Sequence, residues 1–104
     1  MSGSYLLDTC FLIGLQQRYP DAIAIVQAKQ LALRDCAFSV ISRIELLSYP
    51  NLTASDENTI RAMLGQMTCL PLSQNVEEYT IRVRRSKKVK LPDALILATA
   101  KVYG

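Results

Sequence analysis

Residues 89–104 read VKLPDALILATAKVYG, and this stretch predicts a helix with an acid in its first turn. After Leu91 and Pro92, residues recur at the three- and four-residue steps of a buried helix face: Leu95, Ile96, Ala98, Thr99 and Val102. Pro92 suits the first helical position, where a missing N–H breaks no helical hydrogen bond. Asp93 is the one acid in this stretch. Asp93 either stabilises the helix by about 0.3–1 kcal/mol through its interaction with the helix dipole, or it has a role in binding or catalysis.

The rest of the chain alternates short apolar segments with helical ones. We expect strands at residues 4–8, 36–41 and 68–73. We expect helices at residues 9–20, 21–35, 42–50, 55–67 and 75–89, with Asp21 and Ser55 as the N-caps of two of them. Strands separated by helices favour a parallel sheet covered on both faces. The sequence therefore predicts an α/β fold, a three-layer α/β/α sandwich with a short parallel sheet.

The composition narrows the class of protein. A chain of 104 residues that is 50% hydrophobic and 20% charged predicts one folded domain, residues 1–104, and argues against disorder. Its three cysteines are widely spaced and it has no histidine, so neither a disulfide framework nor a zinc site is favoured. The N-terminal segment lacks a basic region, and Asp8 interrupts its apolar run, which disfavours a signal peptide or a membrane span. We expect a cytoplasmic protein with no membrane partner.

The net charge of +3 conceals an asymmetry along the chain. Residues 1–78 carry five basic and eight acidic side chains, whereas residues 79–104 carry seven basic and one acidic. Most of the basic excess lies in the sequence RVRRSKKVK, whose cationic residues we call the basic run: Arg82, Arg84, Arg85, Lys87, Lys88 and Lys90. Such a run can neutralise the phosphates of a nucleic acid. It can equally be a solvated helix face whose cations favour the helix C-terminus.

Three acids fall at junctions between predicted elements. Asp8 follows the first strand, Glu45 lies in the first turn of the helix after the second strand, and Asp93 opens the last helix. Open α/β sheets bind ligands beyond the carboxyl ends of their strands, so all three acids point toward the usual functional edge. Carboxylates that converge repel one another unless a cation lies between them. With oxygen ligands and no histidine, Mg²⁺ or Mn²⁺ is the natural candidate.

Each acid also has a purely structural explanation. Asp8 can cap the helix that begins near Thr9, a gain of about 1 kcal/mol. The sequence SRIE fits a capping box in which Ser42 is the N-cap and Glu45 reaches back to its amide. Together with a dipole role for Asp93, these explanations describe a small α/β domain that binds no metal and changes little when its acids are neutralised.

Three motifs resemble those of the PIN-domain ribonucleases, and more narrowly those of the small VapC-like toxins of bacterial toxin–antitoxin pairs. They follow one another in the expected order and together extend over nearly the whole chain: YLLDTCFLI at 5–13, SVISRIELL at 39–47 and LPDALILATA at 91–100. The resemblance implies a flavodoxin-like strand order and a ribonuclease whose catalytic Mg²⁺ or Mn²⁺ is bound by Asp8, Glu45 and Asp93. It also implies that the metal activates water for attack on an RNA phosphodiester, that Thr9 and Ser42 support the acidic site, and that an antitoxin protein restrains the enzyme.

Two features depart from the family pattern. Cys10 stands where the family commonly has Asn or Ser, and a thiol is a weaker hydrogen-bond donor for support of the metal. In typical relatives the helix of Asp93 is followed by further strands and a fourth acid, so the resemblance implies a domain truncated at its C-terminus. The first strand is then an exposed apolar edge, and we expect a homodimer. The alternative function is a catalytically impaired PIN-like domain that binds RNA or a protein partner.

Overall fold

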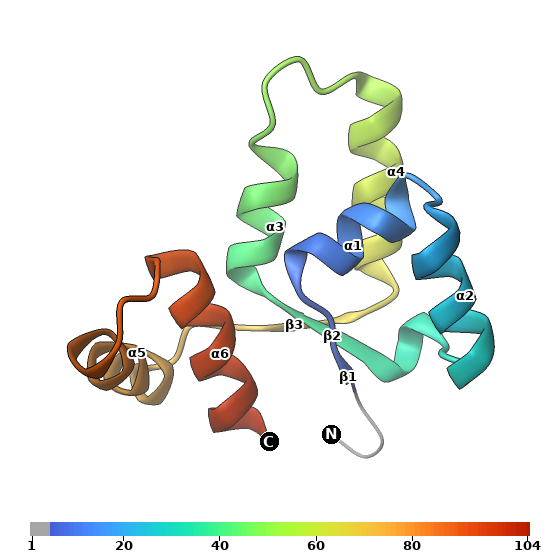
Figure 1. The fold of residues 1–104 in the computed structure, drawn as a ribbon. Helices are drawn as coiled ribbons and strands as arrows, with labels where there is room; N and C mark the ends of the chain where they lie inside the picture. The colour runs from blue at the N-terminus through green and yellow to red at the C-terminus, as the bar shows by residue number, and fades with distance from the viewer. Residues whose placement is uncertain (1–4) are drawn as a thin grey trace.

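The computed structural model describes residues 5–104, which form a small parallel sheet with helices on both sides (Figure 1). The strands are β1 (Tyr5–Leu6), β2 (Cys36–Ser39) and β3 (Thr68–Leu70). The helices are α1 (Thr9–Gln16), α2 (Pro20–Lys29), α3 (Val40–Leu47), α4 (Ala54–Gly65), α5 (Gln74–Ser86) and α6 (Leu91–Tyr103), and a short 3-10 helix lies at Leu33–Asp35. The predicted α/β sandwich is confirmed. Residue 4, expected to begin the first strand, lies outside the described residues. No helix within residues 5–104 is both long and apolar enough to cross a bilayer.

The strands pair in the order β1-β2-β3, and both pairings are parallel. Tyr5 lies opposite Cys36 and Leu6 opposite Ala37, and the Leu7 amide continues the pairing by donating to the Ala37 carbonyl at 2.9 Å. The central strand, β2, is buried at all four of its residues. Within residues 5–104, no strand pairs with the other side of β1. The first strand is therefore at the edge of the sheet, as expected.

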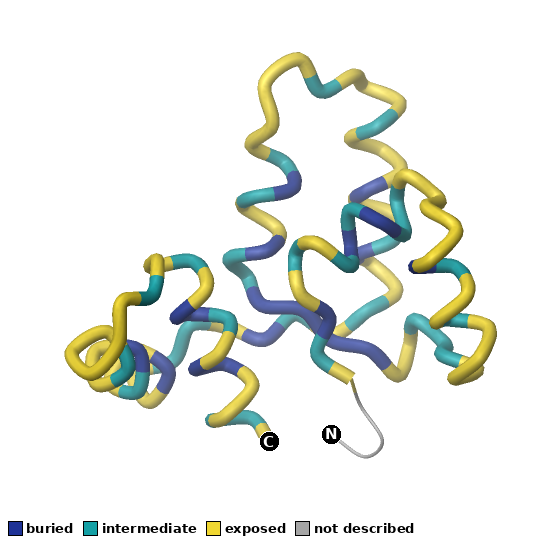
Figure 2. Tube along the Cα trace, viewed as in Figure 1, coloured by how far each residue is buried: buried dark blue, intermediate teal, exposed yellow. Residues whose placement is uncertain are grey.

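Two hydrophobic clusters cover the sheet, because side chains along a strand alternate between its faces. The larger cluster lies between the sheet and α1, α3 and α4, and its buried members are Leu7, Leu12, Cys36, Phe38, Leu46, Ile60 and Leu64. The smaller cluster involves α5 and α6, and its buried members are Val76, Leu95 and Ala98. Figure 2 shows β2 as a continuous buried segment between the two groups of helices. Both faces are covered, as a three-layer sandwich requires.

The N-caps predicted for α2 and α4 are wrong. α2 begins at Pro20, because a proline lacks the N–H that the first helical position leaves unpaired, and Asp21 therefore lies in the first turn and is not the N-cap. The N-cap of α4 is Thr53, whose side chain accepts a hydrogen bond from the Asp56 amide at 3.0 Å. The predicted cap, Ser55, consequently lies inside the helix.

The predicted capping box at Ser42 and Glu45 is wrong. α3 begins at Val40, and its N-cap is Ser39, whose hydroxyl accepts a hydrogen bond from the Ile41 amide at 3.2 Å. β2 ends two residues earlier than predicted, and Ser42 is a buried residue inside the helix. Glu45 accordingly lies in the second turn, not the first, and its carboxylate is available to another partner.

Candidate active site

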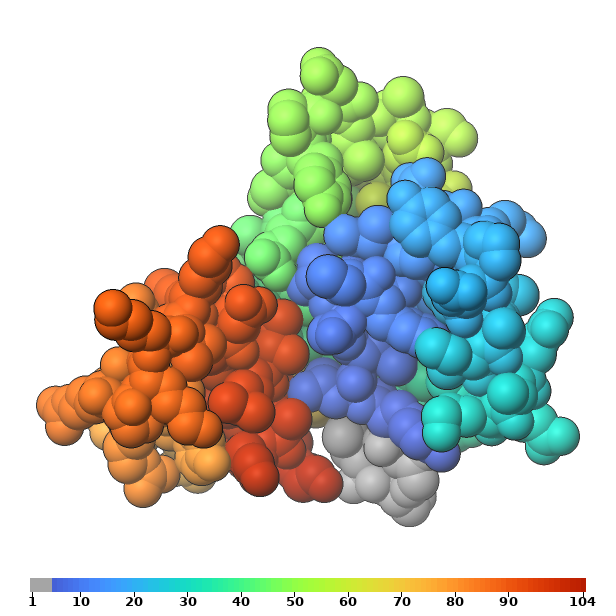
Figure 3. Space-filling model, in the orientation of Figure 1, coloured from blue at the N-terminus to red at the C-terminus, as the bar shows by residue number. Residues whose placement is uncertain are grey.

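Asp8 and Asp93 line one hollow beside the edge of the sheet. Asp8 follows β1 directly and Asp93 lies in the first turn of α6. The hollow encloses about 360 Å³, and its other walls are apolar: Leu6, Ile96, Leu97 and Ala100. In Figure 3, α6 lies against the segment where β1 leads into α1. Both carboxylates are exposed to solvent, so the structure brings two of the three predicted acids to a common, accessible surface.

Asp8 is at the same time the N-cap of α1. Its Oδ1 accepts a hydrogen bond from the Phe11 amide at 2.8 Å, which is the structural role that the sequence allowed for this acid. Within residues 5–104 neither its second oxygen nor the carboxylate of Asp93 has a hydrogen-bond or ion-pair partner. The cap fixes the direction of the Asp8 side chain and leaves one oxygen for a ligand, so capping and cation binding are compatible.

Glu45 is held by a short chain of hydroxyl groups. Thr9 Oγ1 donates to Glu45 Oε1 at 2.7 Å and lies 2.9 Å from Ser42 Oγ. The Thr9 hydroxyl has a single proton, so Ser42 must be the donor in the second hydrogen bond. We call this sequence of bonds, from Ser42 to Thr9 to Glu45, the hydroxyl relay. It ties α3 to the residue that follows Asp8.

The third acid does not complete the hollow. Glu45 is not among the residues that line it, and within residues 5–104 no three Asp, Glu, Cys or His side chains lie close enough to hold one metal ion. The structure therefore joins Asp8 and Asp93 through a shared surface, and connects Glu45 to them only through Thr9. Cys10, the departure from the family motif, is exposed on α1.

The basic run extends from the last turns of α5 to the start of α6. Its three arginines are in α5, its three lysines follow that helix, and all six side chains are exposed. The Arg82 guanidinium carbon lies 5.3 Å from the centre of the Tyr79 ring, a cation–π contact. Lys90 is the N-cap residue of α6, three positions before Asp93. The basic run therefore ends within one helical turn of Asp93.

The apolar walls of the hollow were not predicted. Periodicity assigned Ile96 to the buried face of the last helix, but Ile96 is half-buried and Leu97 is 39% exposed. The residues that α6 buries completely are small, Ala94, Ala98 and Thr99. Small residues at four-residue spacing could have predicted this, because they mark the side of a helix that packs closely against its neighbours. Larger residues beside that face are then only partly buried.

Comparison with known proteins identifies the family. The sequence model of the PIN domain matches residues 5–104. A solved structure described as a toxin–antitoxin complex from Klebsiella pneumoniae is similar at 30% sequence identity and a TM-score of 0.79, over 95% of this chain and 79% of that chain. Comparison with curated proteins finds no match. The fold, the family match and the similar structure agree, and the chain belongs to the PIN domain family.

Proposed function

We propose that this chain is a toxin-type, metal-dependent endoribonuclease that hydrolyses RNA phosphodiester bonds. The observation that carries the proposal is the hollow shared by Asp8 and Asp93, with the basic run ending three residues before Asp93. Carboxylates attract a hard cation, and basic side chains attract phosphates. Side by side, they suit a reaction in which a metal ion meets an RNA backbone.

The available donor atoms fit Mg²⁺ or Mn²⁺. The candidate ligands are carboxylate oxygens, which both ions prefer, and the chain has no histidine. Asp8 keeps one oxygen for the ion while the other accepts from the Phe11 amide. We assign Asp93 as the second ligand. Glu45, which does not line the hollow, would act on the ion through a water that the ion binds. A bound ion would lower the pKa of its water and stabilise the charge that develops on the phosphate.

Other residues of the chain position these groups. In the proposed site the hydroxyl relay fixes the Glu45 carboxylate through hydrogen bonds of 2.9 and 2.7 Å, so Thr9 and Ser42 act as positioning residues. The Phe11 amide fixes Asp8 in the same way. The basic run would hold the phosphates on either side of the scissile bond, contacts that read no sequence.

The proposed protein partner is an antitoxin. The similar solved structure is a toxin–antitoxin complex, and its likeness to this chain extends over 95% of the residues here. Such a partner would keep the ribonuclease from cleaving RNA until the partner is removed. We propose in addition that two copies of the chain associate, since one side of β1 is unpaired within residues 5–104.

The proposal is tested by cleavage of a mixed RNA pool with Mg²⁺, with Mn²⁺ or with EDTA. Asp93→Asn removes one charge from the hollow, and Asp21→Asn is the matched control, because Asp21 is also an exposed acid in the first turn of a helix. We expect metal-dependent cleavage by the wild type and the control, and a loss of about a hundredfold or more in Asp93→Asn. Cleavage by Asp93→Asn at the wild-type rate would contradict the assignment.

A second candidate function is binding without cleavage, in a catalytically impaired domain. It is favoured by the position of Glu45, which does not line the hollow of the other two acids. The same assay separates the two candidates. RNA binding that weakens with salt, without cleavage in either metal and with the fold intact, would select the binding domain.

A further inference from the structure

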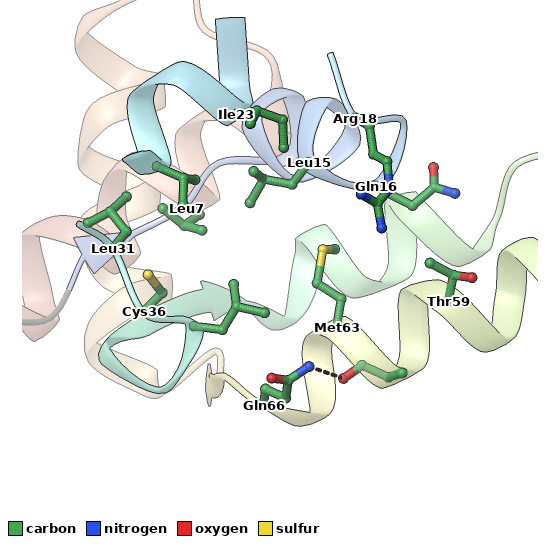
Figure 4. Close-up of a pocket in the computed structure, with 13 residues that line it drawn as sticks. Leu7, Leu15, Gln16, Arg18, Ile23, Leu31, Cys36, Thr59, Met63 and Gln66 are labelled. Atoms are coloured by element: carbon green, nitrogen blue, oxygen red, sulfur yellow. Dashed lines mark hydrogen bonds between the residues drawn. The ribbon is translucent and has the colours of Figure 1, made fainter. Parts of the chain in front are cut away.

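A second hollow lies on the other face of the sheet, between α1, α2 and α4 (Figure 4). Leu7 lines it, whereas the adjacent Leu6 lines the hollow of Asp93. The cavity encloses about 520 Å³. Sites for small molecules typically enclose about 300–1,000 Å³ and combine apolar walls with a few polar groups. This cavity therefore has the size of a ligand site, and it shares no residue with the proposed active site.

The deep end of the cavity is apolar and uncharged. Leu7, Leu31 and Cys36 line this end, and Leu15 and Ile23 continue the apolar wall toward Arg18. Burial, and to a smaller extent the neighbouring carboxylate of Asp35, raises the pKa of the Cys36 thiol. The thiol is therefore neutral at pH 7 and donates to the Ala32 carbonyl, with Sγ 3.4 Å from the oxygen. Such a surface suits an alkyl chain.

Most of the polar side chains lie toward the opposite end, and Gln66 lies apart from them. Figure 4 shows Gln16, Arg18 and Thr59 on that side, with the Arg18 guanidinium pointing into the gap between α1 and α4. Among the residues that the structure describes, Arg18 is the one charged residue that lines the cavity. Within residues 5–104 the one ion pair joins Arg61 and Glu57, so Arg18 has no carboxylate partner there. The mouth of an apolar cavity thus carries a single unpaired cation.

The backbone holds Arg18 in a conformation that would suit glycine better. Its φ is +57°, the left-handed region, at the turn between α1 and α2. The Arg18 amide donates to the Leu15 carbonyl at 3.2 Å and the Tyr19 amide to the Gly14 carbonyl at 2.8 Å, which is the Schellman pattern that ends a helix. Most helices with this ending place glycine here, since a side chain is strained in the left-handed region. The turn fixes the position from which the Arg18 side chain reaches the cavity.

We propose that this cavity binds a small amphiphile with an alkyl tail and an anionic head, such as a medium-chain carboxylate. The tail lies against the leucine and isoleucine side chains of the apolar wall, and the carboxylate accepts hydrogen bonds from Arg18. The argument for this occupant is charge complementarity, because the one charged side chain that lines this largely apolar cavity within residues 5–104 is a cation. The proposal is independent of the nuclease assignment.

The test is a titration followed by the NMR methyl signals of Leu15, Ile23 and Met63. The probes are octanoate, octan-1-ol and octylammonium, which share one tail and differ in the charge of the head. We expect octanoate to bind about five- to tenfold more tightly than octanol, a gain between that of an exposed ion pair and that of a charged hydrogen bond, and octylammonium to bind most weakly. Arg18→Gln should reduce the affinity for octanoate to that for octanol.

Two further variants separate this site from general effects. Arg34→Gln removes the same charge from an exposed arginine that does not line the cavity, and it should leave octanoate binding unchanged. Ala62→Trp fills the cavity from an exposed position of α4, and it should abolish binding of all three probes. Equal affinities for octanoate and octanol, equal losses in the two arginine variants, or full binding by Ala62→Trp would each overturn the proposal. Methyl shifts that follow protein concentration alone would assign the cavity to contact between copies and overturn it as well.

Discussion

Removing the Thr9 hydroxyl should destabilise the protein more than the loss of one surface hydrogen bond would. Thr9→Val keeps the shape of the side chain and removes both bonds of the hydroxyl relay, one of 2.7 Å to Glu45 and one of 2.9 Å from Ser42. A hydrogen bond to a charged group contributes about 1.5–3 kcal/mol, and a buried hydroxyl left without a partner costs about 1–3 kcal/mol. Ser42 is completely buried, whereas Thr9 and Glu45 are only half-buried. We take the lower values and expect the free energy of unfolding to fall by about 2–3 kcal/mol.

The measurement is a double-mutant cycle by urea unfolding, followed by circular dichroism. Ser42→Ala alone should lose about 1 kcal/mol, because Thr9 keeps its bond to Glu45. The double variant should lose about 1 kcal/mol less than the sum of the two single variants, since it contains no stranded Ser42 hydroxyl. Thr9→Ser, which retains a hydroxyl, is the control. Additive losses, or a Thr9→Val variant within about 0.5 kcal/mol of the wild type, would refute the relay.

Four further predictions concern other parts of the molecule. Asp8→Ala should lower the free energy of unfolding by about 1 kcal/mol, because it removes the cap of α1, whereas Asp8→Ser should keep the stability and lose RNA cleavage. Thermal unfolding and the cleavage assay measure the two effects. Equal destabilisation by the two variants would contradict the cap. Light scattering over a concentration series should give a dimer that Tyr5→Lys converts to monomer by charging the edge of β1, and a strictly monomeric wild type would count against association there. The raised pKa of the Cys36 thiol favours the folded state below pH 9.0, the ordinary pKa of this group, and the stability is lost as the pH rises above that value. In urea unfolding, Cys36→Ala should therefore lose less stability at alkaline pH than the wild type. Identical pH profiles of stability would argue against this effect. Arg18→Gly should raise the free energy of unfolding by up to about 1 kcal/mol by relieving the left-handed conformation, so a destabilised variant would show that the side chain contributes more to packing than its backbone loses.

The order of elements was readable from the sequence because each boundary carries a strong local signal. α6 begins at Leu91, one residue before the predicted start at Pro92, and the alternation of apolar segments with helical ones gives the parallel sheet with β1 at its edge. The start of α3 was not readable, since Ser39 and Ser42 are both residues of a preferred N-cap type and the local sequence does not decide between them. Local signals locate an element but do not select among neighbouring caps.

The candidate site was predictable to the extent that it follows from topology. Asp8 and Asp93 converge because a strand end and a helix start meet at one edge of the sheet, and that follows from the order of elements alone. The contact of Glu45 with Thr9 depends on how α3 is rotated against α1, which side-chain packing determines. The cavity beside Arg18 is formed by three helices and has no sequence signature for the same reason.

The edge position of β1 has a consequence for both hollows at once. Leu6 and Leu7 are joined by one peptide unit, each lines a different hollow, and Asp8 is the next residue. Within residues 5–104, β1 has a single hydrogen-bonded neighbour, so its backbone is less restrained than that of a central strand. We therefore expect a ligand bound against Leu7 to shift the backbone that carries Asp8. We expect an occupant of the cavity to alter cation affinity at the acids on the far side of the sheet. By thermodynamic reciprocity, the cation would alter the affinity of that occupant by the same factor.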